Sequence, residues 1–218
     1  MGQSQPLVLL GAGGHAKVLL SLAQAAGRAI IGVCDPLLVK QGVQCWRGIP
    51  VVGGDDALLQ MDRAKVGLIN GIGQLVQGNL RQKVFQRHLD LGFQFPVMVH
   101  PAAWVDPSAT LGQGVQVMAG AVIQADVMIG NNCIVNTRAA IDHDCRLESH
   151  IHIAPGATLC GSVHVESGAF IGCGANIIQG LRIGHDSVVG AGATLVRNLS
   201  AHQILLGAAP RTKTSPFE

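Results

Sequence analysis

The chain has 218 residues and is poor in aromatic side chains, in charge and in long apolar runs. Aromatic residues make up only 3% of the sequence, so the 48% of hydrophobic residues must build a core from aliphatic side chains. A net charge of +2 argues against nucleic acid as a partner. No apolar run is long enough to cross a membrane, and the first residues lack the segments of a secretory signal. We therefore expect a cytoplasmic protein of one or two domains without a membrane partner.

The second half contains a repeat of six residues. Counted in sixes from Val105, sixteen consecutive positions up to Leu195 are branched aliphatic. Neither a helix nor a single strand repeats every six residues, whereas a coil of three short strands joined by turns does. Sixteen hexads correspond to about five and a third coils, and each coil buries its face only against its neighbours. The repeat therefore predicts a parallel β-helix.

The repeat also predicts which side chains point inward. The aliphatic positions face the core, together with a mostly small column two residues earlier that includes Cys133 and Cys145. None of the six cysteines forms a CxxC pair, and we expect all six to be reduced. Glycine follows the aliphatic position five times, where we expect it to let the chain turn tightly. These glycines are Gly112, Gly130, Gly172, Gly184 and Gly190.

The first hundred residues have a different pattern. Short apolar strands are expected at 7–10, 29–33 and 66–69, with helices after the first of them, closed by Gly27, and over 75–91. Such alternation indicates parallel strands in a small Rossmann-like α/β domain. Two prolines, Pro96 and Pro101, mark the passage to the coil, so we divide the chain into domains 1–100 and 101–218.

A glycine-rich turn separates the first strand from the first helix. The segment from Gly11 to Ala16 matches G-x-G-x-x-G/A, and Asp35 follows the second strand, as in dinucleotide-binding folds. Backbone N–H groups at such a helix N-terminus can hold a phosphate. Only about one βαβαβ half is present, which favours a nucleoside-diphosphate ligand. NAD and a purely structural turn remain the alternatives.

Polar residues are concentrated in the hexads from Val135 to Gly161. His143 lies two residues past an aliphatic position, so it should point outward, and the adjacent Asp144 can orient its imidazole and raise its basicity. His152 is half a coil further on and cannot share a wall with His143, although the two can meet across a subunit interface. His150 is expected to be a surface group or a minor contact. A covalent route through Cys145 and a three-histidine zinc site are the less favoured alternatives.

These motifs together resemble the sugar acetyltransferases of bacterial surface-glycan pathways. This family includes N-acetyltransferases for the bacillosamine precursor and for perosamine, and sialic acid O-acetyltransferases. The resemblance covers nearly the whole chain. It rests on the Gly11–Lys17 segment, Asp35, Asn136-Thr137, Ile141–Cys145, His152 and Gly161. It implies a small α/β Rossmann-like N-terminal domain followed by a left-handed parallel β-helix, and a homotrimer with active sites between subunits.

The resemblance implies acetyl-CoA as co-substrate, a nucleotide-linked amino sugar as acceptor, and no metal. His143 then corresponds to the general base and Asp144 to its partner. The implied contacts to acetyl-CoA or its acetyl group are Asn136, His152, the N–H of Gly161, Arg211 and Lys213. The implied nucleotide-sugar site consists of Gly13, Gly14, His15, Lys17 and Asp35.

One departure from the family pattern bears on the substrate. The bacillosamine-type enzymes carry two acidic residues where this chain has Asp35 followed by Pro36. This departure argues against a UDP-linked diamino sugar, and the overall sequence resembles the perosamine enzymes, whose substrate is GDP-linked. The resemblance therefore favours GDP-perosamine, with a UDP-linked 4-amino sugar and sialic acid O-acetylation as alternatives. A nucleotide-binding trimer without catalytic activity is the remote alternative.

Overall fold

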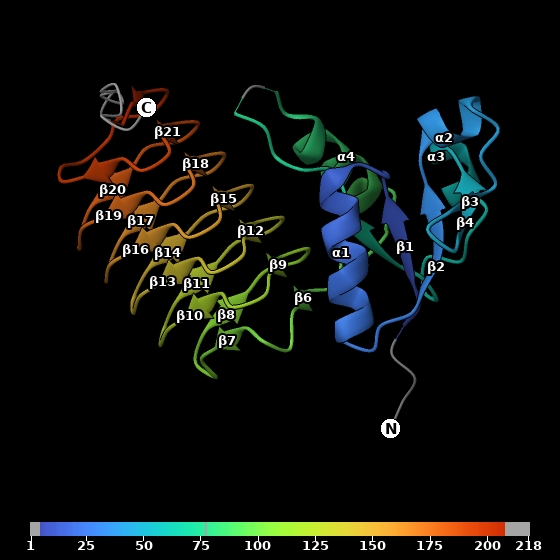
Figure 1. Ribbon diagram of the computed structural model, residues 1–218, viewed down its shortest axis with the longest axis horizontal. Helices are drawn as coiled ribbons and strands as arrows, with labels where there is room; N and C mark the ends of the chain where they lie inside the picture. Colours follow the sequence, from blue (N-terminus) through green and yellow to red (C-terminus); the bar gives the residue numbers. More distant parts are fainter. Residues whose placement is uncertain (1–4, 77, 208–218) are drawn as a thin grey trace, which may run out of the picture.

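The computed structural model describes residues 5–76 and 78–207, which form a small α/β part followed by a long coil of short strands (Figure 1). In the α/β part, the elements are β1 Leu7–Leu10, α1 Gly14–Ala25, β2 Ile30–Cys34, α2 Pro36–Lys40, β3 Cys45–Trp46, β4 Ile49–Gly53, α3 Asp55–Leu58, β5 Gly67–Asn70 and α4 Leu80–Asp90. The sheet order is β3-β4-β2-β1-β5, and all neighbours are parallel except the β3–β4 hairpin. The three expected strands and the Rossmann-like topology are thus confirmed.

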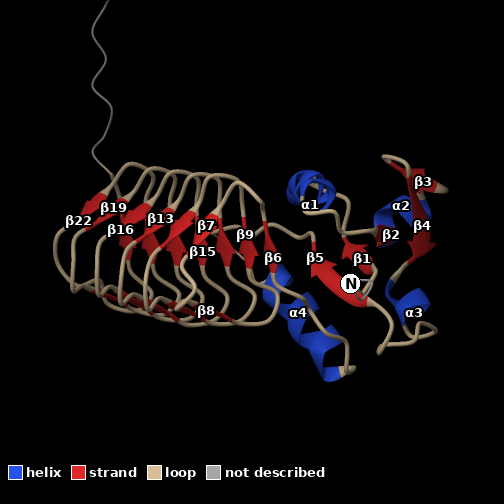
Figure 2. Cartoon of the chain, turned by 90° about the horizontal axis from the view of Figure 1, so that it is seen from below, coloured by secondary structure: helices blue, strands red, loops and turns tan. Residues whose placement is uncertain are grey.

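Helices α1 and α4 cover opposite faces of this sheet (Figure 2). Leu19 and Leu22 of α1 pack with Leu7 and Leu9 on one face, and Phe85 of α4 packs on the other. The second long helix begins at Leu80 rather than at residue 75. The preceding segment contains Gly78, whose φ of 102° is incompatible with a helix of L-residues. The hairpin and the short helices between β2 and β5 were not predicted.

The coil consists of two-residue strands arranged in three parallel sheets. They are β6 Met98–Val99, β7 Trp104–Val105, β8 Thr110–Leu111, β9 Gln116–Val117, β10 Val122–Ile123, β11 Met128–Ile129, β12 Ile134–Val135, β13 Ala140–Ile141, β14 Arg146–Leu147, β15 His152–Ile153, β16 Thr158–Leu159, β17 His164–Val165, β18 Phe170–Ile171, β19 Asn176–Ile177, β20 Arg182–Ile183, β21 Val188–Val189, β22 Thr194–Leu195 and β23 Ile204–Leu205. From β6 to β19, each strand pairs with the one eighteen residues on, as Ile123 does with Ile141. The prediction of three hexads per coil is confirmed.

The aliphatic column forms the core of the coil. Every member from Val117 to Leu195 is buried, and Val105 and Leu111 are partly buried against the same cluster. Cys133 and Cys145 are buried in the small column, as expected. All six cysteines are free thiols.

The predicted reason for glycine after the aliphatic position is wrong. None of these five glycines has a positive φ; the left-handed turn position lies two residues further on, as at Asp126 (φ 60°) and Asp144 (φ 61°). Instead, these glycines allow adjacent coils to approach. A Cβ on Gly172 would lie 2.6 Å from the backbone nitrogen of Ala191, and one on Gly130 would lie 2.7 Å from the carbonyl carbon of Glu148.

The α/β part is docked on the outer face of the sheet that contains β6, β9, β12 and β15, which we call the docking sheet. Leu7, Leu9 and Ala16 share a buried cluster with Met98 and Ile134 of this sheet. Within the described ranges, no helix is long and apolar enough to span a membrane. The docked arrangement places the glycine-rich turn and the segment after β5 next to the coil.

Candidate active site

His143 and Asp144 form an exposed pair on a turn of the coil. Their side chains are 59% and 58% exposed, and His143 Nδ1 lies 2.7 Å from Asp144 Oδ2. Because an ionised carboxylate only accepts, Nδ1 must donate, which leaves Nε2 as the basic nitrogen. The hydrogen bond to Asp144, followed by the negative charge of Asp142, raises the pKa of His143. The expected outward orientation is confirmed.

Gly161 lies against the His143 ring in the next coil. A Cβ at this position would lie 2.6 Å from both Cε1 and Nε2 of His143, so only glycine leaves the ring where it is. Gly161 is a buried residue, and its N–H makes no hydrogen bond within residues 5–76 and 78–207. A backbone N–H without a partner in a buried residue is unusual, and this residue lies against the His143 ring. The Gly161 N–H is therefore available to a ligand oxygen.

Cys145, the candidate for a covalent route, is not accessible. Its side chain is fully buried, and its Sγ lies 3.2 Å from the carbonyl oxygen of Cys160. Burial raises the pKa of the Cys145 thiol to about 11. A nucleophilic cysteine needs a lowered pKa and contact with the substrate, so the structure disfavours the covalent alternative.

The glycine-rich turn lies at the carboxyl end of β1 and is open. Gly13 and Gly14 are exposed, and a Cβ on either would meet no atom within 4 Å. The Asp35 carboxylate accepts from the N–H of Ala12 at 2.8 Å and also caps α2. Asp35 thus fixes the conformation of the turn. Lys17 is exposed on the first turn of α1.

His15 points from this turn toward the coil. Its Nε2 lies 2.8 Å from Oε1 of Gln116, whose Nε2 donates to the carbonyl oxygen of Asn70 at 3.0 Å. Arg81 Nη1 donates to the carbonyl oxygens of Asn70 (2.9 Å) and Ile72 (2.7 Å). Together with Asn132, these residues form a buried polar cluster where the α/β part meets the docking sheet. The cluster holds the segment after β5 against the coil.

Sequence reasoning missed Asn70, Arg81, Gln116 and Asn132. One signal was available for Gln116. Every eighteenth residue from Met98 lies on the outer face of the docking sheet, and Gln116 and His152 interrupt this mostly apolar column. Arg81 gives no such signal, because it lies in an otherwise ordinary amphipathic helix.

Asn136 and His152 lie on the same sheet and interact directly. Asn136 Nδ2 donates to His152 Nε2 at 3.1 Å, and the His152 ring contacts Phe170 edge-on at 4.9 Å. Burial, followed by the positive charge of Arg81, lowers the pKa of both His15 and His152 to about 4. Both rings are therefore neutral at physiological pH.

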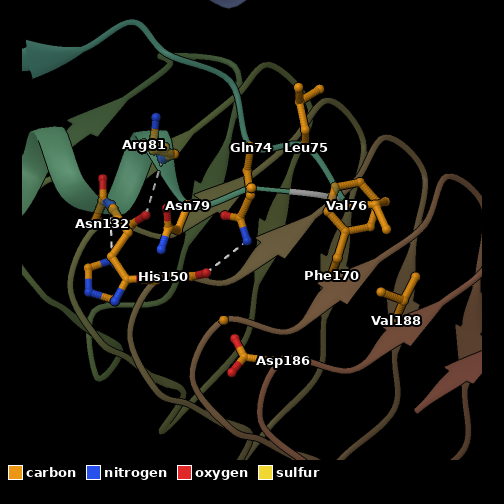
Figure 3. Close-up of a pocket in the computed structure, with 13 residues that line it drawn as sticks. Gln74, Leu75, Val76, Asn79, Arg81, Asn132, His150, Phe170, Asp186 and Val188 are labelled. Atoms are coloured by element: carbon orange, nitrogen blue, oxygen red, sulfur yellow. Dashed lines mark hydrogen bonds between the residues drawn. The ribbon is translucent and has the colours of Figure 1, made fainter. Parts of the chain in front are cut away.

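His150, expected to be a surface group or a minor contact, is partly buried at the docking sheet. Its Nδ1 accepts from Asn132 Nδ2 at 3.0 Å, and its carbonyl oxygen accepts from Gln74 at 2.9 Å. His150 borders a pocket of about 340 Å³ between the segment before α4 and the docking sheet, where Phe170 and Val188 form an apolar wall (Figure 3). Neither His143 nor Gly161 lines this pocket, so it lies apart from the His143–Asp144 pair.

The expected site residues thus form two groups within one chain. His143, Asp144 and Gly161 lie on a turn of the coil, whereas His15, Asn136 and His152 lie at the docking sheet beside the glycine-rich turn. No hydrogen bond or ion pair among the described residues joins the two groups. Arg211 and Lys213 lie outside the described residues.

The two buried histidines make the stability of the fold pH-dependent. Their folded pKa of about 4 lies below the unfolded value of 6.5, so the unfolded chain binds more protons between these limits. The free energy of unfolding is therefore expected to be greatest above pH 6.5 and to fall toward pH 4, by up to about 3 kcal/mol per histidine. Urea denaturation across this range measures the free energy of unfolding. His152→Gln should reduce the pH dependence, and an unchanged slope would contradict the burial argument.

Two family models match this chain. The PglD N-terminal domain matches residues 6–88, and the bacterial transferase hexapeptide (six repeats) matches residues 108–142. A search of curated proteins finds no match.

Several solved structures are similar over nearly the whole chain. A histidine-to-asparagine variant of perosamine N-acetyltransferase from Caulobacter crescentus, in complex with CoA and GDP-perosamine, is 38% identical with a TM-score of 0.84, covering 96% of this chain and 97% of that one. The acetyltransferase domain of PglB from Neisseria gonorrhoeae FA1090, in complex with acetyl coenzyme A, is 34% identical with a TM-score of 0.84, covering 94% and 97%. WeeI from Acinetobacter baumannii AYE, at 22% identity and a TM-score of 0.80 over 94% and 97%, shares the fold. The chain therefore belongs to the hexapeptide-repeat sugar N-acetyltransferases, with a PglD-type N-terminal domain and a left-handed parallel β-helix, and it is an acyltransferase.

Proposed function

We propose that this protein transfers the acetyl group of acetyl-CoA to the amino group of a nucleotide-linked amino-deoxy sugar, with GDP-perosamine as the preferred acceptor. The observation that carries the proposal is the exposed His143–Asp144 pair beside Gly161, whose N–H makes no hydrogen bond within the described residues. The relatives support it, since one was solved with CoA and GDP-perosamine and another with acetyl coenzyme A. The product would serve bacterial surface-glycan synthesis, such as the O-antigen of lipopolysaccharide.

In the proposed mechanism, His143 acts as a general base. Nε2 removes a proton from the acceptor amine, directly or through a water, while Asp144 stabilises the imidazolium that forms. The amine nitrogen bonds to the thioester carbonyl carbon of acetyl-CoA, and the C–S bond then breaks and releases CoA thiolate, which takes up the proton held by His143. The N–H of Gly161 donates to the carbonyl oxygen as it becomes negative, an oxyanion-hole role that fits its lack of an acceptor among the described residues. Neutral His152 and Asn136 contact the acetyl group or the amine.

We further propose a homotrimer with the active sites between subunits. The two groups of site residues lie on different parts of one chain, and a neighbouring subunit would bring His143 to another chain's His15 and His152. Residues 1–100 would bind the nucleotide sugar through Gly13, Gly14, His15, Lys17 and Asp35. Residues 101–218 would carry the transfer reaction, with Arg211 and Lys213 contacting CoA phosphates. We propose the cytoplasm as the location.

The preference for GDP-perosamine rests on Pro36 at the position of a second acid and on the 38% identity to the perosamine enzyme. A UDP-linked 4-amino sugar and a sialic acid hydroxyl are the alternative acceptors. A nucleotide-binding trimer without activity is the alternative outside catalysis. The exposed carboxylate-oriented imidazole favours the enzyme.

The test combines binding and turnover. Thermal unfolding with GDP, UDP, CMP and dTDP should show the largest stabilisation with GDP, because a ligand that binds only the folded state stabilises it by RT ln(1 + [L]/Kd). Release of free CoA thiol from acetyl-CoA should then depend on GDP-perosamine. Stabilisation by UDP with turnover of a UDP-linked amino sugar would overturn the choice of substrate. Nucleotide binding without CoA release from any acceptor would overturn the enzymatic proposal.

A further inference from the structure

Three side chains near the end of the coil take no part in the proposed acetyl transfer. His185 and Asp186 follow β20, and His202 precedes β23 in the next coil. Among the described residues, they form the only group of three or more His, Cys, Asp or Glu side chains whose ligating atoms all lie within 4.8 Å of one another. We propose that His185, Asp186 and His202 form a binding site for a divalent transition-metal ion of the zinc type.

Backbone contacts fix the positions of the turns that carry these side chains. The N–H of His202 donates to the carbonyl oxygen of His185 at 2.9 Å, so the two turns are stacked directly on each other. Asp186 (φ 53°) and His202 (φ 59°) both occupy left-handed turn positions, from which a side chain projects outward. The two imidazole rings lie 4.4 Å apart at 84°. The ligands therefore come from two adjacent coils whose relative positions are already set.

Asp186 is held close to His185. Its Oδ2 lies 3.3 Å from His185 Nδ1, and its carboxylate passes over Gly168, where a Cβ would collide with Oδ1. Asp186 also stands at the rim of the pocket beside Phe170 and Val188 (Figure 3). The nearby Arg182 is neutralised by an ion pair with Glu166, so it does not repel a cation from the site.

Two imidazole nitrogens and one carboxylate oxygen suit Zn²⁺, and also the neighbouring ions that prefer imidazole, Ni²⁺ and Cu²⁺. The side chains of His185 and Asp186 are 50% and 60% exposed, so a fourth position is open to water. A bound ion would link two adjacent coils near the end of the described residues and would stabilise their contact.

The experiment is a calorimetric titration of untagged protein with Zn²⁺ in the absence of both substrates. The exposed thiols of Cys45 and Cys173 would compete for the ion, so every protein carries serine at both positions. We expect one ion per chain, with the affinity reduced at least about tenfold by His185→Ala, His202→Ala or Asp186→Asn, as for other essential metal-site groups. His164→Ala is the matched control, because His164 is paired only with Glu148.

Anomalous diffraction at the zinc edge should show the ion between the two histidines. The absence of binding at neutral pH, or an affinity unchanged by all three substitutions, would overturn the proposal. Because no substrate is present, this result is independent of the proposed acetyl transfer.

Discussion

The His143→Ala protein is expected to fold like the wild type and to lose acetyl transfer by about 10² to 10⁴ in kcat, the usual contribution of a general base. The side chain is 59% exposed and fills no core position, so stability should hardly change. The measurements are kcat, KM for both substrates and the urea midpoint. A variant as active as the wild type would remove His143 from the mechanism.

The matched control is His164→Ala. His164 also lies on the outer face of the coil and contacts a carboxylate, Glu148, at 3.4 Å, but it takes no part in the proposed site. It should retain wild-type kcat. If both variants lost activity equally, the effect would reflect a general disturbance of the coil.

The pH dependence of activity distinguishes a general-base role of His143 from a role in substrate binding alone. Asp144 and Asp142 raise the pKa of His143, and only the neutral imidazole can accept a proton. Activity should therefore fall as the pH decreases through this raised pKa. Asp144→Asn removes the main cause of the shift, so it should lower kcat and move the acidic limb to lower pH. A limb that did not move would indicate that another group controls the profile.

The coil was predictable because its pattern is local and redundant. Each strand of the repeat contributes one aliphatic side chain to the same core, so the period alone sets the register of Val117, Val135 and Ile153 in one sheet. The outward position of His143 follows from its place two residues past Ile141. The same counting places Cys145 inside, which separates the base from the buried thiol.

The buried polar cluster was not predictable in the same way. Arg81 becomes buried only because α4 is docked near the turn that carries Asn132, and no periodicity in its helix reports that contact. Asp35 illustrates the same limit. The sequence placed it after β2 as a ligand candidate, but it did not indicate that the carboxylate also accepts from the N–H of Ala12 and caps α2. Contacts between the α/β part and the coil depend on how the two parts dock, and neither sequence pattern specifies that geometry.

Gly161→Ala, which adds a single carbon atom, should reduce catalysis without reducing stability. The added Cβ would lie 2.6 Å from Cε1 and Nε2 of His143, so the ring must move. It can move because it is the free end of an exposed side chain. The shift costs little folding energy. It displaces the basic nitrogen, however, and a displacement of about 1 Å can cost about 10²-fold in rate. We expect kcat to fall by about that factor with an unchanged urea midpoint.

Gly172→Ala is the opposite case on the same coil. Its Cβ would lie 2.6 Å from the nitrogen of Ala191 and 2.7 Å from the carbonyl oxygen of Val189, both backbone atoms that cannot rotate away. This variant should lose about 1–3 kcal/mol of stability, the cost of overpacking. Its kcat, measured where it is folded, should stay near wild type. If Gly161→Ala instead lost stability and kept its rate, the His143 ring would be a packing group, and the base would have to be sought among His15 and His152.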